Sequence, residues 1–190
     1  MYKIKIITST TRPGRKGIAV ARWLENITAK ESEFEVELLD LAEIGLPLMD
    51  EPVHPRLQQY QHTHTKEWSA RINSADAFIF VLGEYNYGVP APLKNALDYL
   101  YKEWMYKPVG IVSYGGASGG MRSTQMLRQI LSAFHSLPLS AGVAIVQFSK
   151  FFEEERFVPE AAVEKVTEIM LGELKDYCVI SKDLRKKRGA

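Results

Sequence analysis

Residues 9–17 read Ser-Thr-Thr-Arg-Pro-Gly-Arg-Lys-Gly, which places three hydroxyl groups and three cations directly before a segment with helical spacing. The N-terminus of a helix attracts anions, because its free backbone N–H groups and its dipole point toward them. Hydroxyl groups add hydrogen-bond donors, and arginine forms paired, charge-assisted bonds. This segment therefore predicts a site for a terminal phosphate group. The simpler alternative is a polar loop that only caps a helix.

Two further segments combine polar residues with aromatic rings or glycines. Residues 83–90 read Gly-Glu-Tyr-Asn-Tyr-Gly-Val-Pro, and tyrosine rings can stack on a flat heterocycle while loop N–H groups bond to its rim. Residues 113–120 read Ser-Tyr-Gly-Gly-Ala-Ser-Gly-Gly, and glycines let a backbone approach a ligand without side-chain obstruction. Taken singly, each segment could be an ordinary surface turn.

Short apolar runs alternate with segments of helical spacing along the chain. We expect strands near residues 4–8, 34–41, 77–82, 109–112 and 144–146, and helices near residues 20–27, 66–74, 93–101, 126–134 and 163–174. This alternation predicts an α/β fold, a three-layer sandwich around a five-stranded parallel sheet. Residues 77–82 are wholly apolar, as expected for a central strand covered on both faces.

The predicted sheet explains why the three segments belong together. Each follows a predicted strand, and ligands of open parallel sheets bind outside the carboxyl ends of the strands. We therefore expect one site built from three loops. Residues 46–64 contain three prolines and read as a long surface loop beside it.

Two familiar nucleotide sites are poorly supported. No Gly-x-Gly-x-x-Gly follows the first predicted strand, although Asp40 stands where the acid of a dinucleotide site would bind ribose. No Gly-x-x-x-x-Gly-Lys-Ser/Thr is present either, which argues against a P-loop nucleotide hydrolase.

The second loop and the helix after it carry a family signature. Glu84-Tyr85-Asn86, Pro90 and the run Leu93-Lys94-Asn95-Ala96-Leu97-Asp98 resemble the NADPH-dependent FMN reductases, a flavodoxin-like group that includes quinone, chromate and azo-dye reductases. The loop at Ser9 to Arg12, the loop at Ser113 to Gly116 and the segment Leu46 to Asp50 are similar in kind and position. The resemblance covers roughly residues 3–176. It implies the strand order 2-1-3-4-5 and a flavodoxin-like FMN-binding domain over residues 1–180.

The resemblance also implies the roles of individual residues. The FMN phosphate would be surrounded by Ser9, Thr11, Arg12 and Gly17, with Arg15 as an addition. The isoalloxazine ring would be lined by Gly83, Glu84, Tyr85 and Asn86, and closed on its other side by Ser113, Tyr114, Gly115 and Gly116. The flavin carries the chemistry, so we expect no catalytic side chain. NADPH or NADH would donate electrons to a small acceptor: a quinone, an azo dye, a metal oxyanion or free flavin.

Two functions of other classes compete with this reductase. One is a non-enzymatic electron carrier of flavodoxin type, but a carrier usually needs a strongly acidic docking face. The charge without the basic residues 182–190 is near −3 (+1 minus +4), which does not supply one. The other is a flavin- or nucleotide-sensing module whose partner responds to its redox state.

Composition limits the partners and the compartment. The net charge of +1 does not favour nucleic acid as a partner, and no apolar run is long enough to span a membrane. Residues 181–190 are strongly basic, and we expect them to form a solvated tail. Cys178 is the one cysteine, which fits a reducing compartment, and no secretory signal pattern opens the chain; we expect a cytoplasmic protein.

Two clusters carry weaker indications. His54, His62 and His64 lack a convincing set of metal ligands, and we expect no metal site. Trp104, Met105 and Tyr106 could be core, an acceptor pocket or a dimer surface. The resemblance implies a homo-oligomer, a dimer or tetramer, so we favour the dimer surface.

Overall fold

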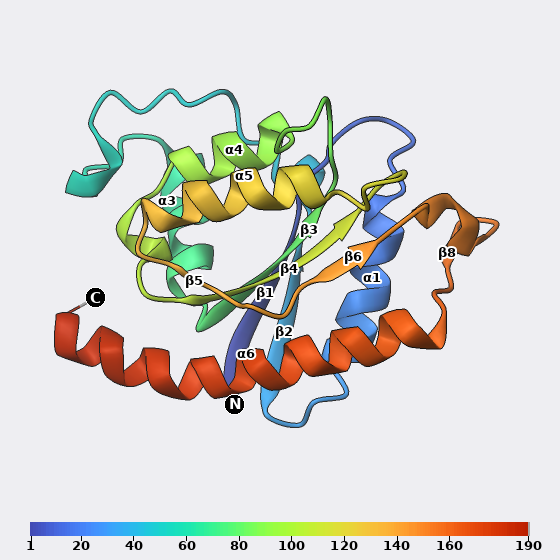
Figure 1. Cartoon of the computed structure of the whole chain (residues 1–190). Helices are drawn as coiled ribbons and strands as arrows, with labels where there is room; N and C mark the ends of the chain where they lie inside the picture. The colour runs from blue at the N-terminus through green and yellow to red at the C-terminus, as the bar shows by residue number, and fades with distance from the viewer. Residues whose placement is uncertain (190) are drawn as a thin grey trace.

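The computed structural model describes residues 1–189, and it shows strands and helices alternating along the chain (Figure 1). The elements of the main body are β1 (Tyr2–Thr8), α1 (Gly17–Thr28), β2 (Phe34–Leu39), α2 (Leu41–Ile44), η1 (Pro55–Leu57), α3 (Thr63–Asn73), β3 (Ala77–Leu82), α4 (Ala91–Asp98), η2 (Lys102–Trp104), β4 (Pro108–Tyr114), α5 (Met121–Ser132), β5 (Leu137–Pro138) and β6 (Val143–Ile145). They are followed by η3 (Phe148–Phe151), β7 (Phe152–Glu153), β8 (Arg156–Phe157) and α6 (Ala161–Arg188).

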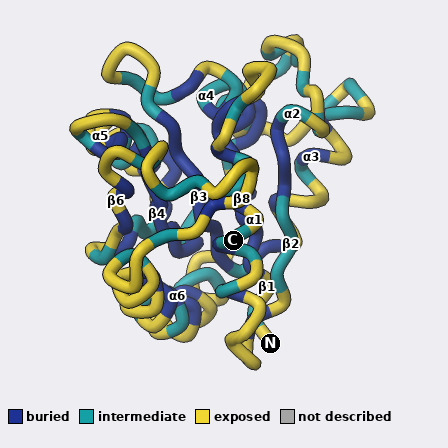
Figure 2. The backbone as a smooth tube through the Cα atoms, turned by 90° about the vertical axis from the view of Figure 1, so that its right-hand side faces the viewer, coloured by how far each residue is buried: buried dark blue, intermediate teal, exposed yellow. Residues whose placement is uncertain are grey.

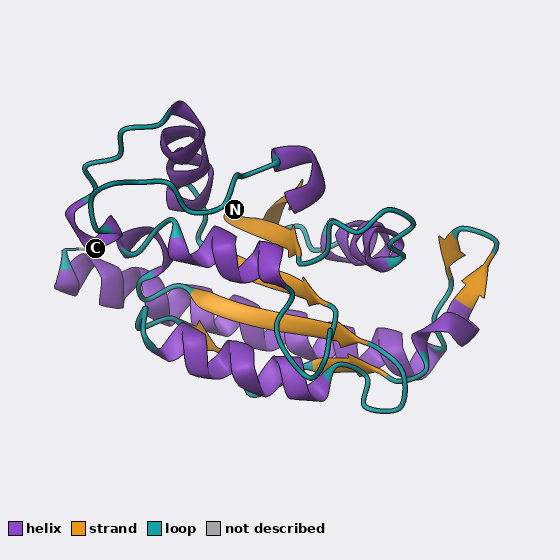
Figure 3. Ribbon diagram, turned by 90° about the horizontal axis from the view of Figure 1, so that it is seen from above, coloured by secondary structure: helices purple, strands orange, loops and turns teal. Residues whose placement is uncertain are grey.

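The main sheet is parallel and has the order β2-β1-β3-β4-β5, which confirms the predicted topology. The fifth row differs from the prediction, because it consists of two short strands. Both β5 and β6 pair with β4, at opposite ends of it, and residues 139–142 interrupt the row between them. The antiparallel β7–β8 hairpin lies outside the main sheet (Figure 3).

The sheet separates two hydrophobic cores. Alternate side chains of β3 explain why: Phe78 and Phe80 pack with α3, α4 and α5, whereas Ile79 and Val81 pack with α1 and α6. Every residue of β3 is buried, as expected for a strand covered on both faces. Figure 2 shows the strands buried in the interior while the outer faces of the helices are exposed.

The C-terminal segment is not a tail in this structure. Helix α6 continues to Arg188, so residues 181–188 form its last turns. Arg185 holds this end to the residue just before β3, because its Nη2 donates to Asp76 Oδ1 at 2.9 Å. Cys178 on the same helix is buried, and that burial raises the pKa of its thiol to about 12. Among residues 1–189, no helix combines the length and the apolar character needed to cross a bilayer.

The aromatic residue expected at a dimer surface lies in the core instead. Trp104 is buried, its ring packs edge-on against Trp68 and Phe78, and its indole N–H donates to Leu97 O at 3.2 Å. Its neighbours Met105 and Tyr106 are only half-buried. Of the three alternatives left open by the sequence, Trp104 therefore fits the first, a place in the hydrophobic core.

The long loop at residues 46–62 is pinned to the body by polar contacts. Asn95 Nδ2 donates to Pro47 O at 2.6 Å, and Asn95 Oδ1 accepts from Met49 N at 2.9 Å. Further along, the buried Glu103 carboxylate accepts from the hydroxyl of Tyr60 at 2.9 Å. This loop also carries Asp50, whose Oδ1 lies 3.0 Å from His64 Nε2.

Candidate functional site

A cavity of about 310 Å³ lies at the carboxyl edge of the sheet, where β1, β3 and β4 end. Its walls come from the three loops singled out in the sequence, together with one residue from beyond the last strand. They are Thr10, Arg12, Gly14, Arg15, Lys16, Gly83, Glu84, Tyr85, Tyr114, Gly115, Gly116 and Phe148. The parallel sheet brings these segments together because its carboxyl ends lie at one edge.

The hydroxyl residues after β1 divide their roles by the direction in which they point. Ser9 is fully buried, and its Oγ accepts from Gly83 N at 2.9 Å, so it ties the first loop to the second. Thr10 lines the cavity instead, with its hydroxyl 3.3 Å from the Tyr114 hydroxyl. Thr11 is exposed and lines a neighbouring hollow beside α2 and α4. Of the three hydroxyl groups, the one on Thr10 is therefore the best placed to meet a ligand in this cavity.

The ring of Tyr114 reaches from β4 across to the first loop, and Gly17 makes room for it. A Cβ at Gly17 would collide with the Tyr114 hydroxyl and would lie 2.8 Å from its ring carbon Cζ. No rotation of a neighbour relieves that collision cheaply, because Tyr114 is itself buried. Burial raises the pKa of the Tyr114 phenol, although the nearby Thr10 hydroxyl opposes the shift, so the phenol stays protonated at neutral pH. Gly17 thus contributes space, and Tyr114 contributes a hydroxyl in that space.

Three cations surround the N-terminal end of α1, and they differ in how free they are. Arg15 Nη2 lies 2.5 Å from Asp40 Oδ2, so its charge is largely compensated. Asp40 is held in turn by Thr8, whose hydroxyl donates to Asp40 Oδ1 at 3.0 Å. Arg12 is exposed, and among residues 1–189 it forms no ion pair. Lys16 is also exposed and forms no ion pair within residues 1–189, and its Nζ lies 4.6 Å from the centre of the Phe152 ring. Arg12 and Lys16 are therefore the cations with most attraction left for an incoming anion.

Glu84 faces away from the middle of the cavity and toward the start of α5. Its carboxylate accepts from the backbone N–H groups of Arg122 at 3.0 Å and Ser123 at 3.3 Å, and from Ser118 Oγ at 3.1 Å. Partial burial raises the pKa of Glu84, but these hydrogen bonds and Arg122 outweigh it, so the pKa lies below its usual value. The ionised Glu84 thus caps α5 and fixes the second loop against the third.

The second loop ends in a tight turn. Tyr85 and Gly88 exchange backbone hydrogen bonds of 3.2 and 2.9 Å, while Asn86 and Tyr87 between them take positive φ angles of 50° and 68°. The guanidinium of Arg122 lies over the Tyr87 ring at 4.1 Å. This turn leaves Tyr85 at the cavity wall and directs Asn86 to the outside of it.

The third loop presents backbone to the cavity. A Cβ at Gly116 would meet nothing within 4 Å, so this face of the loop is open. Gly120 has a φ of 78° and a Cβ there would lie 3.0 Å from Tyr114 O, so a glycine is required for α5 to start so close to β4. Ser113 is buried and turns its hydroxyl toward Val143 O at 3.4 Å, away from the cavity.

The structure thus brings together most of the residues expected at the site, though not all. Arg12, Arg15, Gly83, Glu84, Tyr85, Tyr114, Gly115 and Gly116 line the cavity, whereas Ser9, Thr11, Gly17, Asn86 and Ser113 do not. The sequence reasoning passed over Thr10, Gly14, Lys16 and Phe148. Thr10 and Lys16 stand in a loop already singled out. Phe148 follows β6 at the same edge of the sheet. Its position after a predicted strand could have identified it as a site residue.

The first 150 residues decide the family. Residues 2–150 match the family model described as NADPH-dependent FMN reductase. The chain belongs to the NADPH-dependent FMN reductase family. This membership confirms the resemblance drawn from Glu84-Tyr85-Asn86 and the helix after it, and with it the expected FMN, nicotinamide nucleotide and oxidoreductase class.

Relatives of this chain are found among fungal enzymes. It is 43% identical over 126 residues to an NAD(P)H-dependent FMN reductase of Schizosaccharomyces pombe, a match that spans 65% of this chain and 63% of that protein. It is 36% identical over 155 residues to an NAD(P)H-dependent FMN reductase of Nectria, covering 78% and 77% of the two chains. Its fold is similar to that of FerB, a flavoenzyme NAD(P)H:acceptor oxidoreductase of Paracoccus denitrificans, with a TM-score of 0.72 at 20% identity over 96% and 98% of the chains.

The residues of the cavity fit FMN. The hydroxyl of Thr10 and the cations of Arg12 and Lys16 meet at the start of α1, as a phosphate requires. The open backbone of Gly116, with the ring of Tyr85, offers flat walls to an isoalloxazine.

Proposed function

We propose that this protein uses one bound FMN to transfer electrons from NADPH or NADH to a small acceptor: a quinone, an azo dye, a metal oxyanion or free flavin. The proposal is carried by one cavity that joins a cationic helix start to an aromatic and glycine-rich wall, in a chain of the FMN reductase family. Relatives named for quinone and azo-dye reduction support the range of acceptors.

The chain's own residues would act by binding and orientation. Arg12, Lys16 and the α1 N-terminus would hold the phosphate, with Thr10 donating to it. Glu84 would keep the second and third loops at a fixed separation, because it belongs to the second loop and accepts hydrogen bonds from Ser118 of the third loop and from Arg122 at the start of α5. FMN, when bound, supplies the hydride and electron chemistry. The protein would set where the flavin's ring lies and which face is open to the nicotinamide.

The decisive experiment is an anaerobic titration of the purified, FMN-loaded protein. We expect NADPH or NADH to bleach the flavin absorbance, and a quinone to restore it over many turnovers. No FMN binding at micromolar concentrations would overturn the proposal. Bleaching by dithionite but by neither nucleotide would instead favour the non-enzymatic carrier.

We also propose a cytoplasmic homo-oligomer. The compartment is supported by the single cysteine, which is buried and so cannot form a disulfide without unfolding around it. Self-association is supported by apolar side chains left exposed on α6, which include Ile169 and Ile180.

A further inference from the structure

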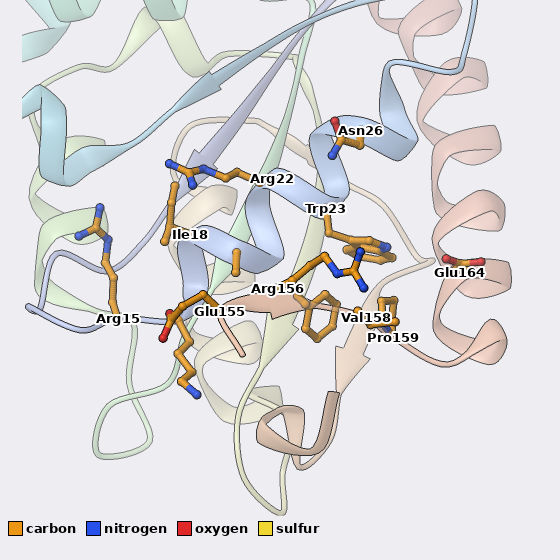
Figure 4. Close-up of a pocket in the computed structure, with 13 residues that line it drawn as sticks. Arg15, Ile18, Arg22, Trp23, Asn26, Glu155, Arg156, Val158, Pro159 and Glu164 are labelled. Carbon is orange, nitrogen blue, oxygen red and sulfur yellow. The ribbon is translucent and has the colours of Figure 1, made fainter. Parts of the chain in front are cut away.

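A second and larger cavity lies outside the candidate flavin site. It has a volume of about 660 Å³ and runs between α1 and residues 155–159 of the hairpin segment, with Glu164 at its edge (Figure 4). We call it the α1–hairpin cleft. Its size suits a ligand of the dimensions of a nucleotide.

One end of the cleft is aromatic and apolar. Trp23 of α1 and Phe157 of β8 meet edge to face, with ring centroids 5.3 Å apart and an angle of 73° between planes. Val158 and Pro159 continue this wall, and the Asn26 amide lies one turn further along α1. Flat apolar walls with an amide nearby match a heterocyclic base, which has apolar faces and a polar rim.

The other end of the cleft is basic. In Figure 4, Arg15 and Arg22 lie together with Ile18 toward one side, while Trp23, Val158 and Pro159 lie toward the other. Arg15 is compensated by Asp40 at 2.5 Å, and Lys16 lies 4.6 Å from the centre of the Phe152 ring. Arg22 is exposed and has no ion pair within residues 1–189.

The cleft carries charges of both signs. Its lining contains four basic side chains (Arg15, Lys16, Arg22 and Arg156) and two acidic ones (Glu155 and Glu164). Arg156 forms an ion pair with Glu153, with Nη2 2.7 Å from Oε2. With Arg15 and Arg156 compensated, two cations, Lys16 and Arg22, remain beside two carboxylates, Glu155 and Glu164. Attraction for an anion is therefore local to Arg22 and Lys16, both on or next to α1.

The basic end adjoins the candidate flavin site. Arg15 and Lys16 line both the cleft and the cavity at the sheet edge, so the two spaces share a wall. From Lys16 to Trp23 the helix rises about 10 Å, seven residues at 1.5 Å each, so a ligand that contacts both residues must be extended along α1. A ligand with its base at Trp23 thus has its phosphates next to the flavin site.

We propose that the α1–hairpin cleft binds the adenosine half of NADPH, with adenine against Trp23 and Phe157 and the 2′-phosphate on Arg22. This inference rests on the proposed function, because the nicotinamide half must reach the flavin past Arg15 and Lys16. It makes Arg22 the residue that distinguishes NADPH from NADH, since NADH lacks the 2′-phosphate.

Tryptophan fluorescence tests the cleft without any turnover. Trp68 and Trp104 are buried in the core, so a ligand in the cleft should change the emission of Trp23 alone. We expect adenosine 2′,5′-bisphosphate to quench the FMN-loaded protein saturably, and Trp23→Phe to abolish the change. Arg22→Ala should weaken this binding about tenfold, the low end for a charge-assisted bond because Arg22 is exposed.

A matched control and a kinetic arm complete the test. Arg71 is exposed on α3, on the opposite face of the sheet, so Arg71→Ala should leave the affinity unchanged. In turnover, Arg22→Ala should raise the KM for NADPH about tenfold and leave the KM for NADH unaltered. Equal effects on both nucleotides, unchanged affinity in Arg22→Ala, or release of FMN by the bisphosphate would overturn the assignment. Failure of both nucleotides to reduce the flavin would refute the proposed function. The bisphosphate titration would still show whether the α1–hairpin cleft binds the adenosine half.

Discussion

Arg12 is the residue on which the phosphate assignment depends most. Since Asp40 compensates Arg15, we expect Arg12→Ala to weaken FMN roughly 10- to 150-fold, the range for a hydrogen bond to a charged group of about 1.5–3 kcal/mol. Salt screening at this exposed position favours the lower end. Riboflavin has the same ring and sugar chain without the phosphate, so its affinity should barely change. Paired titrations of FMN and riboflavin on both proteins measure the difference.

Arg15→Ala is the matched control for that experiment. Removing Arg15 leaves the buried Asp40 without its cation, so this variant should lose folding stability. Its FMN affinity should fall less than that of Arg12→Ala, because Asp40 already compensates the charge of Arg15. Equal losses of FMN and riboflavin in Arg12→Ala would show that the loop after β1 does not hold the phosphate.

Gly17 and Tyr114 form a steric pair at the same site. A serine at position 17 would overlap the buried Tyr114 hydroxyl, so we expect Gly17→Ser to lower the free energy of unfolding by about 1–3 kcal/mol. Adding Tyr114→Phe removes the colliding oxygen and should recover part of that loss. Urea unfolding of the two single variants and the double variant gives the coupling. Strictly additive effects would contradict a direct collision.

At the scale of single elements, the C-terminal end of α3 is held by a buried lysine. Lys107 directly precedes β4 and is 4% exposed. Its Nζ donates to Ile72 O at 2.8 Å and to Asn73 O at 3.0 Å. Burial, reinforced by the positive charge of Arg185, lowers the pKa of Lys107 from 10.5 to about 7. The unfolded chain therefore binds more protons than the folded one between about pH 7 and 10.5.

This shift predicts a pH dependence that belongs to one side chain. Because the folded-state pKa is depressed, Lys107 opposes folding fully below pH 7, and that penalty falls as the pH rises toward 10.5. Wild type should gain up to about 1.4 kcal/mol per pH unit from this group over that range, and Lys107→Met should lack the gain. The measurement is urea unfolding of both proteins at pH 7 and pH 9, with the exposed Lys66→Met as control. Parallel pH profiles for wild type and Lys107→Met would contradict the assignment of this pH dependence to Lys107.

At the scale of the whole molecule, α6 offers the clearest surface for self-association. Ile169 and Ile180 are 57% and 60% exposed, and their spacing of eleven residues, three helical turns, puts them on one face. We expect sedimentation at tens of micromolar to give a mass above the 21.5 kDa of one chain. Replacing both isoleucines with aspartate should shift the protein toward the monomer. In the oligomer the new carboxylates would be buried against apolar side chains of the other copy, which costs free energy.

The same experiment separates this face from the aromatic segment favoured by the sequence. Met105→Asp changes a half-buried residue beside the buried Trp104. If Met105→Asp dissociates the oligomer and the α6 variant does not, the interface lies at residues 101–106. A monomeric wild type would refute self-association altogether.

The order of the elements and the three loops of the site could be predicted from the sequence, because both follow from local pattern. Apolar runs such as residues 77–82 specify buried strands, and alternation with helices specifies a parallel sheet whose carboxyl ends share an edge. Motif residues such as Glu84-Tyr85-Asn86 are contiguous, so the family could be recognised without knowing what they contact.

Only the tertiary structure decided which side chain does what within those loops. Ser9, Thr10 and Thr11 are equivalent as residue types, but the direction set by β1 buries the first, turns the second to Tyr114 and leaves the third outside. The cleft beside α1 was not predictable for the same reason, since Trp23 and Phe157 are 134 residues apart in the chain. Contacts between distant segments depend on packing, which local spacing does not encode.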